Sequence, residues 1–536
     1  MKRWNAIVLT LIALAACTQV HTAHRTNSGG ETLRVGSAIA PNSFNPLLPT
    51  ESVENMLDQL VFDKLVKVDS RGNLVPDLAV VVPSQQNGGI SKDGLSVTYH
   101  LRRGVQWQDG KPFTSGDVKF SFEQVMNPRN NISSHVGYDD VRRVDTPNTY
   151  TIVFHLKARY GPIVDTLFSS NVSPEDVVPE HLLRGNADLN NVPFNSAPVG
   201  TGPYRMTKWI RDDHIEFEAN PHYFFGKPHI KNIFVYLIPQ ENTAINELRT
   251  HELAWFYNGS EASYDQLKNI SAIRTVVSDQ NSYRGMLFNT ESPLVSDVRV
   301  RQAIAYAIDK KSIVNKVTYG AIQAATEDLP SFMWAYNPKV QTYEYAPQKS
   351  RALLAQAGWK PGPDGILQKN GRQMELRFVL RQGAVADTEM SIIIQSQLRE
   401  VGIATSIKTF LGSMLFLNGR TGILAGGHYD IDLSGFASGI DPDNSAQFIC
   451  SARPPNGYNW SRYCNAEMDA AQRQALGSYD RTVRRAAYAR VESLLARDVP
   501  QIFMYWAPEI DAVNPDLRGF TGGPFEPDWN VSEWSW

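Results

Sequence analysis

Residues 99–123 read YHLRRGVQWQDGKPFTSGDVKFSFE, and this stretch combines a strand, a tight turn and the start of a helix. Asp109 and Gly110 give a turn signal, and Thr114 or Ser115 can cap the helix that follows. One face of that helix is expected to carry Val118, Phe122 and Val125. The strand is predicted from the alternation of Leu95, Val97, Tyr99 and Leu101, which is typical of a half-buried strand.

A second stretch, VRVRQAIAYAIDKKSIV at residues 298–314, predicts two consecutive helices. Asp297 and Asp309 each precede one of these helices, where a side-chain carboxylate can accept free backbone N–H groups. The buried stripe of the first helix is predicted to contain Val300, Ala303, Ile304, Ala307 and Ile308.

Strand and helix patterns alternate along the rest of the chain. The 536 residues are too many for one hydrophobic core, so two to four domains are expected. The alternation predicts α/β lobes. Further strands are predicted at residues 149–156, 282–290, 374–381, 428–436 and 500–510, and further helices at 387–402, 465–476 and 480–500.

The composition excludes several classes of protein. Lys and Arg number 52 against 55 Asp and Glu, so the net charge is −3 and no basic stripe indicates a nucleic-acid partner. No run of eighteen apolar residues predicts a membrane-spanning helix. The chain carries no P-loop, HExxH, GxSxG or Rossmann glycine motif, and its 11 histidines are scattered. We therefore expect no catalytic site, no cofactor and no metal.

The N-terminus has the features of an export signal. Lys2 and Arg3 precede a short apolar run that ends in Leu14-Ala15-Ala16-Cys17. This ending resembles the lipobox of bacterial lipoproteins, in which Cys17 would be lipidated after removal of residues 1–16. The alternative is an ordinary secreted protein with a cysteine there by chance. Residues 17–31 are predicted to be a flexible tether.

Only two other cysteines exist, Cys450 and Cys464. An exported chain with one such pair favours a disulfide. A zinc site would need two more ligands at suitable spacing, and the sequence offers none.

Six stretches together resemble the family 5 extracellular solute-binding proteins, which serve ABC importers of oligopeptides, dipeptides, nickel and related solutes. They span nearly all of the chain after the tether, in order. The stretches are FNPLL (44–48), YHLRRGVQWQDGKPFTSGDVKFSFE (99–123), PVGTGPY (198–204), NPHYFFGKPHIKNI (220–233), VRVRQAIAYAIDKKSIV (298–314) and GYNWSRYCNAEMDAA (457–471).

This resemblance implies a two-lobe periplasmic-binding-protein fold, type II and class C-like, with a hinge where the chain crosses twice. Lobe I would comprise residues 32–278 and 503–536, and lobe II residues 279–502. The crossings would lie near SYRGMLF (282–288) and PQIFMYW (500–506). The expected protein is a monomeric extracytoplasmic receptor, lipid-anchored to a bacterial membrane, that closes around its ligand and delivers it to permease subunits.

The stretch SGFASGIDPDNS at residues 434–445 is the main candidate for the binding site. In peptide-binding relatives, a Gly-aromatic pair here is followed three positions later by an acid that pairs with the ligand's α-amino group. Gly435 and Phe436 match the pair, but Gly439 occupies the acid's position. Asp441 is the candidate for a relocated anchor, and its alternative role is that of a turn residue. Ala437 and Ser438 are expected to line the same site.

Four further residues are candidates for ligand contact. Arg381 follows a strand where dipeptide-binding relatives use an arginine to hold the ligand carboxylate. Ser52, Trp334 and Tyr505 are expected to face the cleft, although each of the four could instead be structural. The resemblance favours oligopeptides or dipeptides. A non-peptide solute, such as an oligosaccharide, opine or metal chelate, and a secreted hydrolase remain alternatives.

Overall fold

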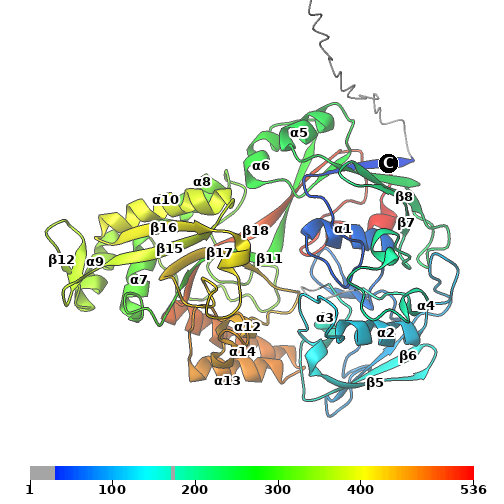
Figure 1. Cartoon of the computed structure of the whole chain (residues 1–536), viewed down its shortest axis with the longest axis horizontal. Coiled ribbons are helices and arrows are strands. Elements are labelled where there is room, and N and C mark those ends of the chain that lie inside the picture. Colours follow the sequence, from blue (N-terminus) through cyan, green and yellow to red (C-terminus); the bar gives the residue numbers. More distant parts are fainter. Residues whose placement is uncertain (1–30, 171–175) are drawn as a thin grey trace, which may run out of the picture.

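A mixed ten-stranded sheet runs through the computed structural model, which describes residues 31–170 and 176–536. Figure 1 shows its strands on both sides of the molecule, with two long strands between them. In spatial order the strands are β16 (Ala404–Phe410), β15 (Glu375–Arg381), β17 (Ile431–Ala437), β11 (Arg274–Phe288), β18 (Gln501–Val513), β10 (Trp255–Tyr257), β1 (Thr32–Ser37), β9 (Asn232–Leu237), β8 (His214–Ala219) and β7 (Tyr204–Ile210).

The stretch at residues 99–123 forms the predicted strand, turn and helix. The helix begins after Thr114, whose side-chain oxygen accepts from the Gly116 N–H, and Asp117 completes a capping box. One part of the prediction is wrong: Leu95 is 40% exposed and precedes the strand, because its N–H donates to the Asp93 side chain in a turn. The elements are β4 (Ser96–His100) and α2 (Ser115–Val125).

This unit belongs to a small subdomain on the right of Figure 1. Its three strands pair in the order β4, β6 (Thr151–Leu156) and β5 (Val141–Asn148), and α2 packs on β5 and β6. Its other elements are α3 (Ile163–Thr166), α4 (Glu180–Leu183), η1 (Tyr138–Asp140) and η2 (Pro193–Ser196).

The stretch at residues 298–314 forms two consecutive helices, as predicted. Asp297 and Asp309 cap them through their side chains, which accept from the N–H groups of Arg299 and Ser312. All five residues of the predicted stripe are at most 1% exposed. The helices are α7 (Val298–Ala307) and α8 (Lys310–Val317).

Two antiparallel strands, β11 and β18, connect the two sides of the sheet. Residues 274–279 of β11 pair with 508–513 of β18, and residues 283–287 pair with 501–506. The register shifts between the two halves. The hydrophobic clusters divide at the same place: two contain residues before 274 and after 509, and three contain residues 283–505. We therefore propose lobes that exchange within these strands, close to the boundaries drawn from the sequence.

The remaining elements lie around the large sheet, and five of them are strands that pair as two smaller sheets (Figure 1). On the first side these are α1 (Ser52–Val61), β2 (Val66–Val68), β3 (Leu74–Pro76), α5 (Glu241–Arg249), α6 (Glu261–Leu267) and η4 (Val531–Glu533). On the second side they are α9 (Pro347–Gln356), β12 (Lys360–Pro361), β13 (Leu367–Lys369), β14 (Arg372–Gln373), α10 (Val385–Glu400), α11 (Gly412–Leu415), α12 (Ser445–Phe448), η3 (Cys450–Ala452), α13 (Ala466–Leu476) and α14 (Arg481–Asp498).

Candidate functional site

The loop after β17 lies beside the connecting strand β11. Phe436 of β17 pairs with Tyr283 of β11, and Gly435 pairs with Arg284. A Cβ atom on Gly435 would lie 2.7 Å from the Tyr283 carbonyl oxygen, so the close approach of the two strands requires glycine here. Beyond the strand, the Ser438 N–H donates to the Asn281 carbonyl over 2.8 Å. The loop is therefore fixed to β11.

A pocket of about 250 Å³ separates this loop from the subdomain around β4–β6. Four residues predicted from the sequence line it together: Phe436, Ala437, Ser438 and Asp441. Phe436 and Gly435 also line a smaller neighbouring pocket. The other lining residues of the larger pocket are Ser133, Ser134, Val136, Tyr160, Pro162 and Thr166 on the subdomain side, and Gly439, Asp443, Ala446 and Tyr458 on the side of the loop.

Asp441 is paired inside the protein. Arg484 of α14 donates from Nη2 to both carboxylate oxygens, over 2.7 and 2.6 Å, and both side chains are at most 8% exposed. The Tyr488 hydroxyl also donates to Asp441, over 3.3 Å. Burial lowers the pKa of Arg484, but the nearby Asp441 carboxylate raises it further, so the net direction is upward. The Asp441 charge is thus already balanced by a buried cation.

A second carboxylate, Asp443, faces the same pocket. Its Oδ2 accepts from the Tyr160 hydroxyl over 3.4 Å, and its Oδ1 accepts from the Ser445 N–H over 2.9 Å. Burial raises the pKa of Asp443. No ion pair joins it to a Lys or Arg within the described ranges 31–170 and 176–536. Asp443 therefore lacks, among the described residues, the positively charged partner that Asp441 has in Arg484.

The two sides of the pocket touch at its edge. The Gly161 N–H donates to the Leu476 carbonyl over 2.6 Å, and the Tyr479 hydroxyl donates to the Gly94 carbonyl over 3.0 Å. Asp165 lies close to Asp441 across this edge, and burial first, then Asp441, raises the pKa of Asp165 to about 8. The structure therefore has the two sides closed on each other here.

A row of aromatic rings extends from the pocket along the side that carries β17. Ring centroids are separated by 6.1 Å between Phe436 and Tyr458, by 5.8 Å between Tyr458 and Trp460, and by 5.4 Å between Trp460 and Phe416. Tyr458 is 45% exposed. These rings offer an apolar wall on which an extended ligand can pack.

The other candidates from the sequence lie outside these two pockets. Trp334 packs beneath the guanidinium groups of Arg481 and Arg484, 5.2 and 5.3 Å from its ring centroid. Tyr505 is fully buried and donates to Glu261 over 3.3 Å. The two remaining candidates are exposed at ends of elements: Ser52 begins α1 and Arg381 ends β15. Ligand contacts of all four stay predictions.

Several lining residues were not predicted. Tyr160, Pro162 and Thr166 come from a part of the chain with no recognisable motif, and only the fold brings them to the pocket. Tyr458 does belong to a stretch with family resemblance, GYNWSRYCNAEMDAA. Its aromatic side chain was the one signal that the sequence offers, and its exposure is known only from the structure.

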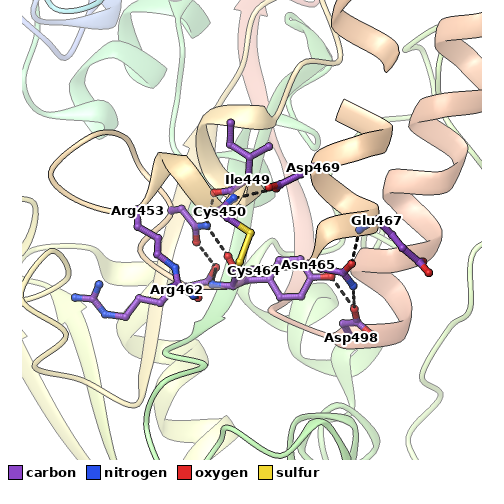
Figure 2. The surroundings of a disulfide bond; sticks show 12 residues. Ile449, Cys450, Arg453, Arg462, Cys464, Asn465, Glu467, Asp469 and Asp498 are labelled. Carbon is purple, nitrogen blue, oxygen red and sulfur yellow. Dashed lines mark hydrogen bonds between the residues drawn. A yellow bond between two sulfur atoms is a disulfide. The ribbon is translucent and has the colours of Figure 1, made fainter. Parts of the chain in front are cut away.

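The disulfide near the pocket joins Cys450 to Cys464 (Figure 2). The Cys450 N–H donates to Asp469 of α13 over 3.0 Å, and the amide of Asn465 donates to Asp498 at the end of α14 over 3.0 Å. The bridge therefore closes the segment that carries Tyr458, and the two hydrogen bonds attach its ends to α13 and α14.

Cys17 and the predicted signal and tether up to residue 30 lie outside the described residues. Within the described part of the chain, no helix combines the length and apolar character needed to cross a membrane.

Comparison with known proteins identifies the family. The family model for "Bacterial extracellular solute-binding proteins, family 5 Middle" matches residues 73–457, more than two thirds of the chain. The oligopeptide-binding protein AppA of Bacillus subtilis is 27% identical over 546 residues, covering 99% of this chain and 97% of AppA.

Two solved structures have the same fold over almost their whole length. One is AppA from Bacillus subtilis in complex with a nonapeptide (TM-score 0.77, 26% identity, 94% of this chain and 99% of that one). The other is NikZ from Campylobacter jejuni in complex with Ni(L-His) (TM-score 0.77, 28% identity, 94% and 99%). The chain therefore belongs to the family 5 bacterial extracellular solute-binding proteins.

Proposed function

We propose that this protein is the peptide receptor of an ABC importer, which encloses its ligand between two lobes and delivers it to permease subunits. The pocket between the β17 loop and the subdomain carries this proposal, because it combines a partly buried carboxylate, Asp443, with an adjoining aromatic wall. The similarity to AppA, whose structure contains a nonapeptide, supports the peptide class.

Asp443 is the proposed partner of the peptide's α-amino group. A buried ammonium group needs a carboxylate partner, because a buried unpaired charge costs several kcal/mol. Asp441 has its counter-charge in Arg484, whereas the described residues give Asp443 only hydroxyl and backbone donors. Asp441 then shapes the loop, and the rings of Phe436 and Tyr458 contact peptide side chains.

A non-peptide solute is the second candidate. Two observations support it. Gly439 stands where peptide-binding relatives carry the amine-pairing acid, and Asp441 already forms an ion pair with Arg484. The similarity to NikZ, whose structure contains Ni(L-His), shows that this fold also holds metal complexes.

Native mass spectrometry of the protein, purified without denaturation from a bacterial periplasm, distinguishes the two candidates. A ladder of bound masses that fragment as peptides is the expected result. A single bound mass that does not fragment as a peptide would replace the peptide class by another solute.

The protein is further proposed to act as a monomer, to perform no chemistry and to be held at a bacterial membrane by lipid on Cys17. Support for the anchor is the basic start, apolar run and small residues before this cysteine. Expression of the full chain and a Cys17→Ser variant with radiolabelled palmitate tests it. Label in the wild-type protein alone is expected, and an unlabelled wild-type protein would contradict the anchor.

A further inference from the structure

Three buried carboxylates meet on the second side of the molecule, away from the pocket described above. Glu327 and Asp328 lie in the segment between α8 and α9, and Glu492 projects from α14. One oxygen atom from each group lies within 4.8 Å of the others. The three residues are 2%, 4% and 1% exposed, so water screens their charges poorly.

Four oxygen atoms of these groups accept no hydrogen bond from any described residue outside the three, although a protonated Glu492 donates to Asp328 and Glu327. They are Oε2 of Glu327, Oδ1 of Asp328 and both oxygens of Glu492. The remaining two are satisfied: Oε1 of Glu327 accepts from the Asn337 N–H over 2.9 Å, and Oδ2 of Asp328 accepts from the Asn444 amide over 2.7 Å. Glu492 is the decisive side chain, since its carboxyl group projects from a separate helix toward the other two and has no partner outside the three groups among the described residues.

No basic residue compensates these charges. Among residues 31–170 and 176–536, neither a Lys nor an Arg forms an ion pair with any of the three. Lys310 lines the adjoining pocket, but it donates to the Ala325 carbonyl instead. Burying three carboxylates without a cation is costly. The groups must therefore share protons or bind a cation.

A pocket of about 110 Å³ reaches Glu327 and Glu492 from the surface. Its wall includes Lys310 of α8, the exposed Glu344 and Ala496 of α14. The pocket has room for water molecules beside the carboxylates. It supplies both a route of entry and a source of additional oxygen ligands.

We propose that Glu327, Asp328 and Glu492 form a binding site for a calcium ion. Calcium takes six to eight oxygen ligands in flexible geometry and commonly uses one bidentate carboxylate. Glu492 can supply two oxygens and the other two residues one each, with water from the pocket completing the shell. All of the available donors are oxygens, which suits calcium better than zinc, since zinc prefers nitrogen and sulfur.

The site is joined to the candidate binding loop and to a connecting strand. Asp328 accepts from Asn444, which lies directly after Asp443 in the loop. The Trp506 indole of β18 donates to the Glu327 carbonyl over 3.0 Å. A bound ion would therefore hold the segment 327–328, the loop and β18 in one arrangement.

Calcium titration of the EDTA-treated protein tests the proposal. Calorimetry should give one saturable site, and Tm should rise with calcium. Terbium is a second probe, because the Trp506 indole, which donates to the Glu327 carbonyl, lies close enough to sensitise its emission. Glu492→Gln should weaken calcium binding about tenfold or more, since it removes one charge and the bidentate ligand. Asp328→Asn is the second variant if Glu492→Gln does not fold.

Glu344→Gln is the matched control. Glu344 lines the same pocket but is exposed and pairs with Lys311, so its variant should bind calcium like the wild-type protein. The proposal is overturned if calcium gives no heat and no rise in Tm in the wild-type protein. It is also overturned if Glu492→Gln or Asp328→Asn responds as the wild type does. In either case the carboxylates share protons instead. No peptide is present in these experiments, so their outcome is independent of the proposed ligand class.

Discussion

At the scale of single residues, Asp443 and Asp441 are predicted to have different roles, the first in ligand binding and the second in stability. Asp443→Asn should weaken binding of peptides with a free amine by about ten- to hundredfold, the worth of a hydrogen bond to a charged group. N-acetylated peptides should bind the variant and the wild type alike. Isothermal titration calorimetry measures both. Asp265→Asn is the control, because Asp265 is an exposed acid of α6 that lies outside the pocket, so its variant should bind like the wild type.

Equal affinity of Asp443→Asn and the wild type for free-amine peptides would remove Asp443 from the site. A loss that N-acetylated peptides share would instead indicate a general distortion of the loop.

Asp441 is predicted to matter for stability. Asp441→Asn leaves the buried guanidinium of Arg484 without its carboxylate, so the free energy of unfolding should fall by about 3 kcal/mol. Urea unfolding followed by circular dichroism measures this loss. The double variant Asp441→Asn/Arg484→Gln should recover part of it, because the uncompensated charge is then absent. A single variant as stable as the wild type would contradict the structural role.

The site residues that could be predicted from the sequence are those that lie close together in the chain. Phe436, Ala437, Ser438 and Asp441 are close in sequence and line one pocket. Glu327 and Glu492 are brought together only by the packing of α14, and no spacing rule connects them. The resemblance also says nothing of Arg484, which decides the electrostatic state of Asp441.

At the scale of elements, local signals predicted where helices begin. The capping residues Thr114, Asp297 and Asp309 each begin the helix predicted for them, because a side-chain cap depends only on neighbouring backbone N–H groups. The strand pattern at residues 95–101 began too early by one residue. Leu95 is apolar, but hydrogen bonding within the preceding turn takes it out of the strand.

The segment between Cys450 and Cys464 is predicted to depend on its covalent closure. The two cysteines are 14 residues apart, and closing a loop of this size stabilises by about 3 kcal/mol in the chain-entropy model. A Cys450→Ser/Cys464→Ser variant should therefore unfold at lower urea concentration and bind its ligand more weakly, since Tyr458 lies within the loop. Reducing agent should destabilise the wild type but leave the variant unchanged. A wild type insensitive to reduction would contradict the prediction.

At the scale of the whole molecule, closure should be visible in solution. The two sides of the pocket touch through Gly161 and Tyr479, so the structure has a closed edge. Without ligand these few contacts compete with solvent, and we expect a larger radius of gyration. Small-angle X-ray scattering with and without a bound peptide measures the change. A radius of gyration that the peptide leaves unchanged would mean that the lobes do not move.

The pairing of β11 with β18 along both halves restricts how the lobes can move. Two hydrogen-bonded strands resist sliding past each other, because sliding would break the ladder that joins them. They resist much less when bent out of the plane of the sheet, above all where the register shifts between Asp279 and Tyr283. The two strands are therefore expected to bend easily in one direction only, out of the plane of the sheet. Ligands of different length should then change how far the strands bend but not the axis about which they bend. A membrane partner would need to recognise only one direction of lobe closure.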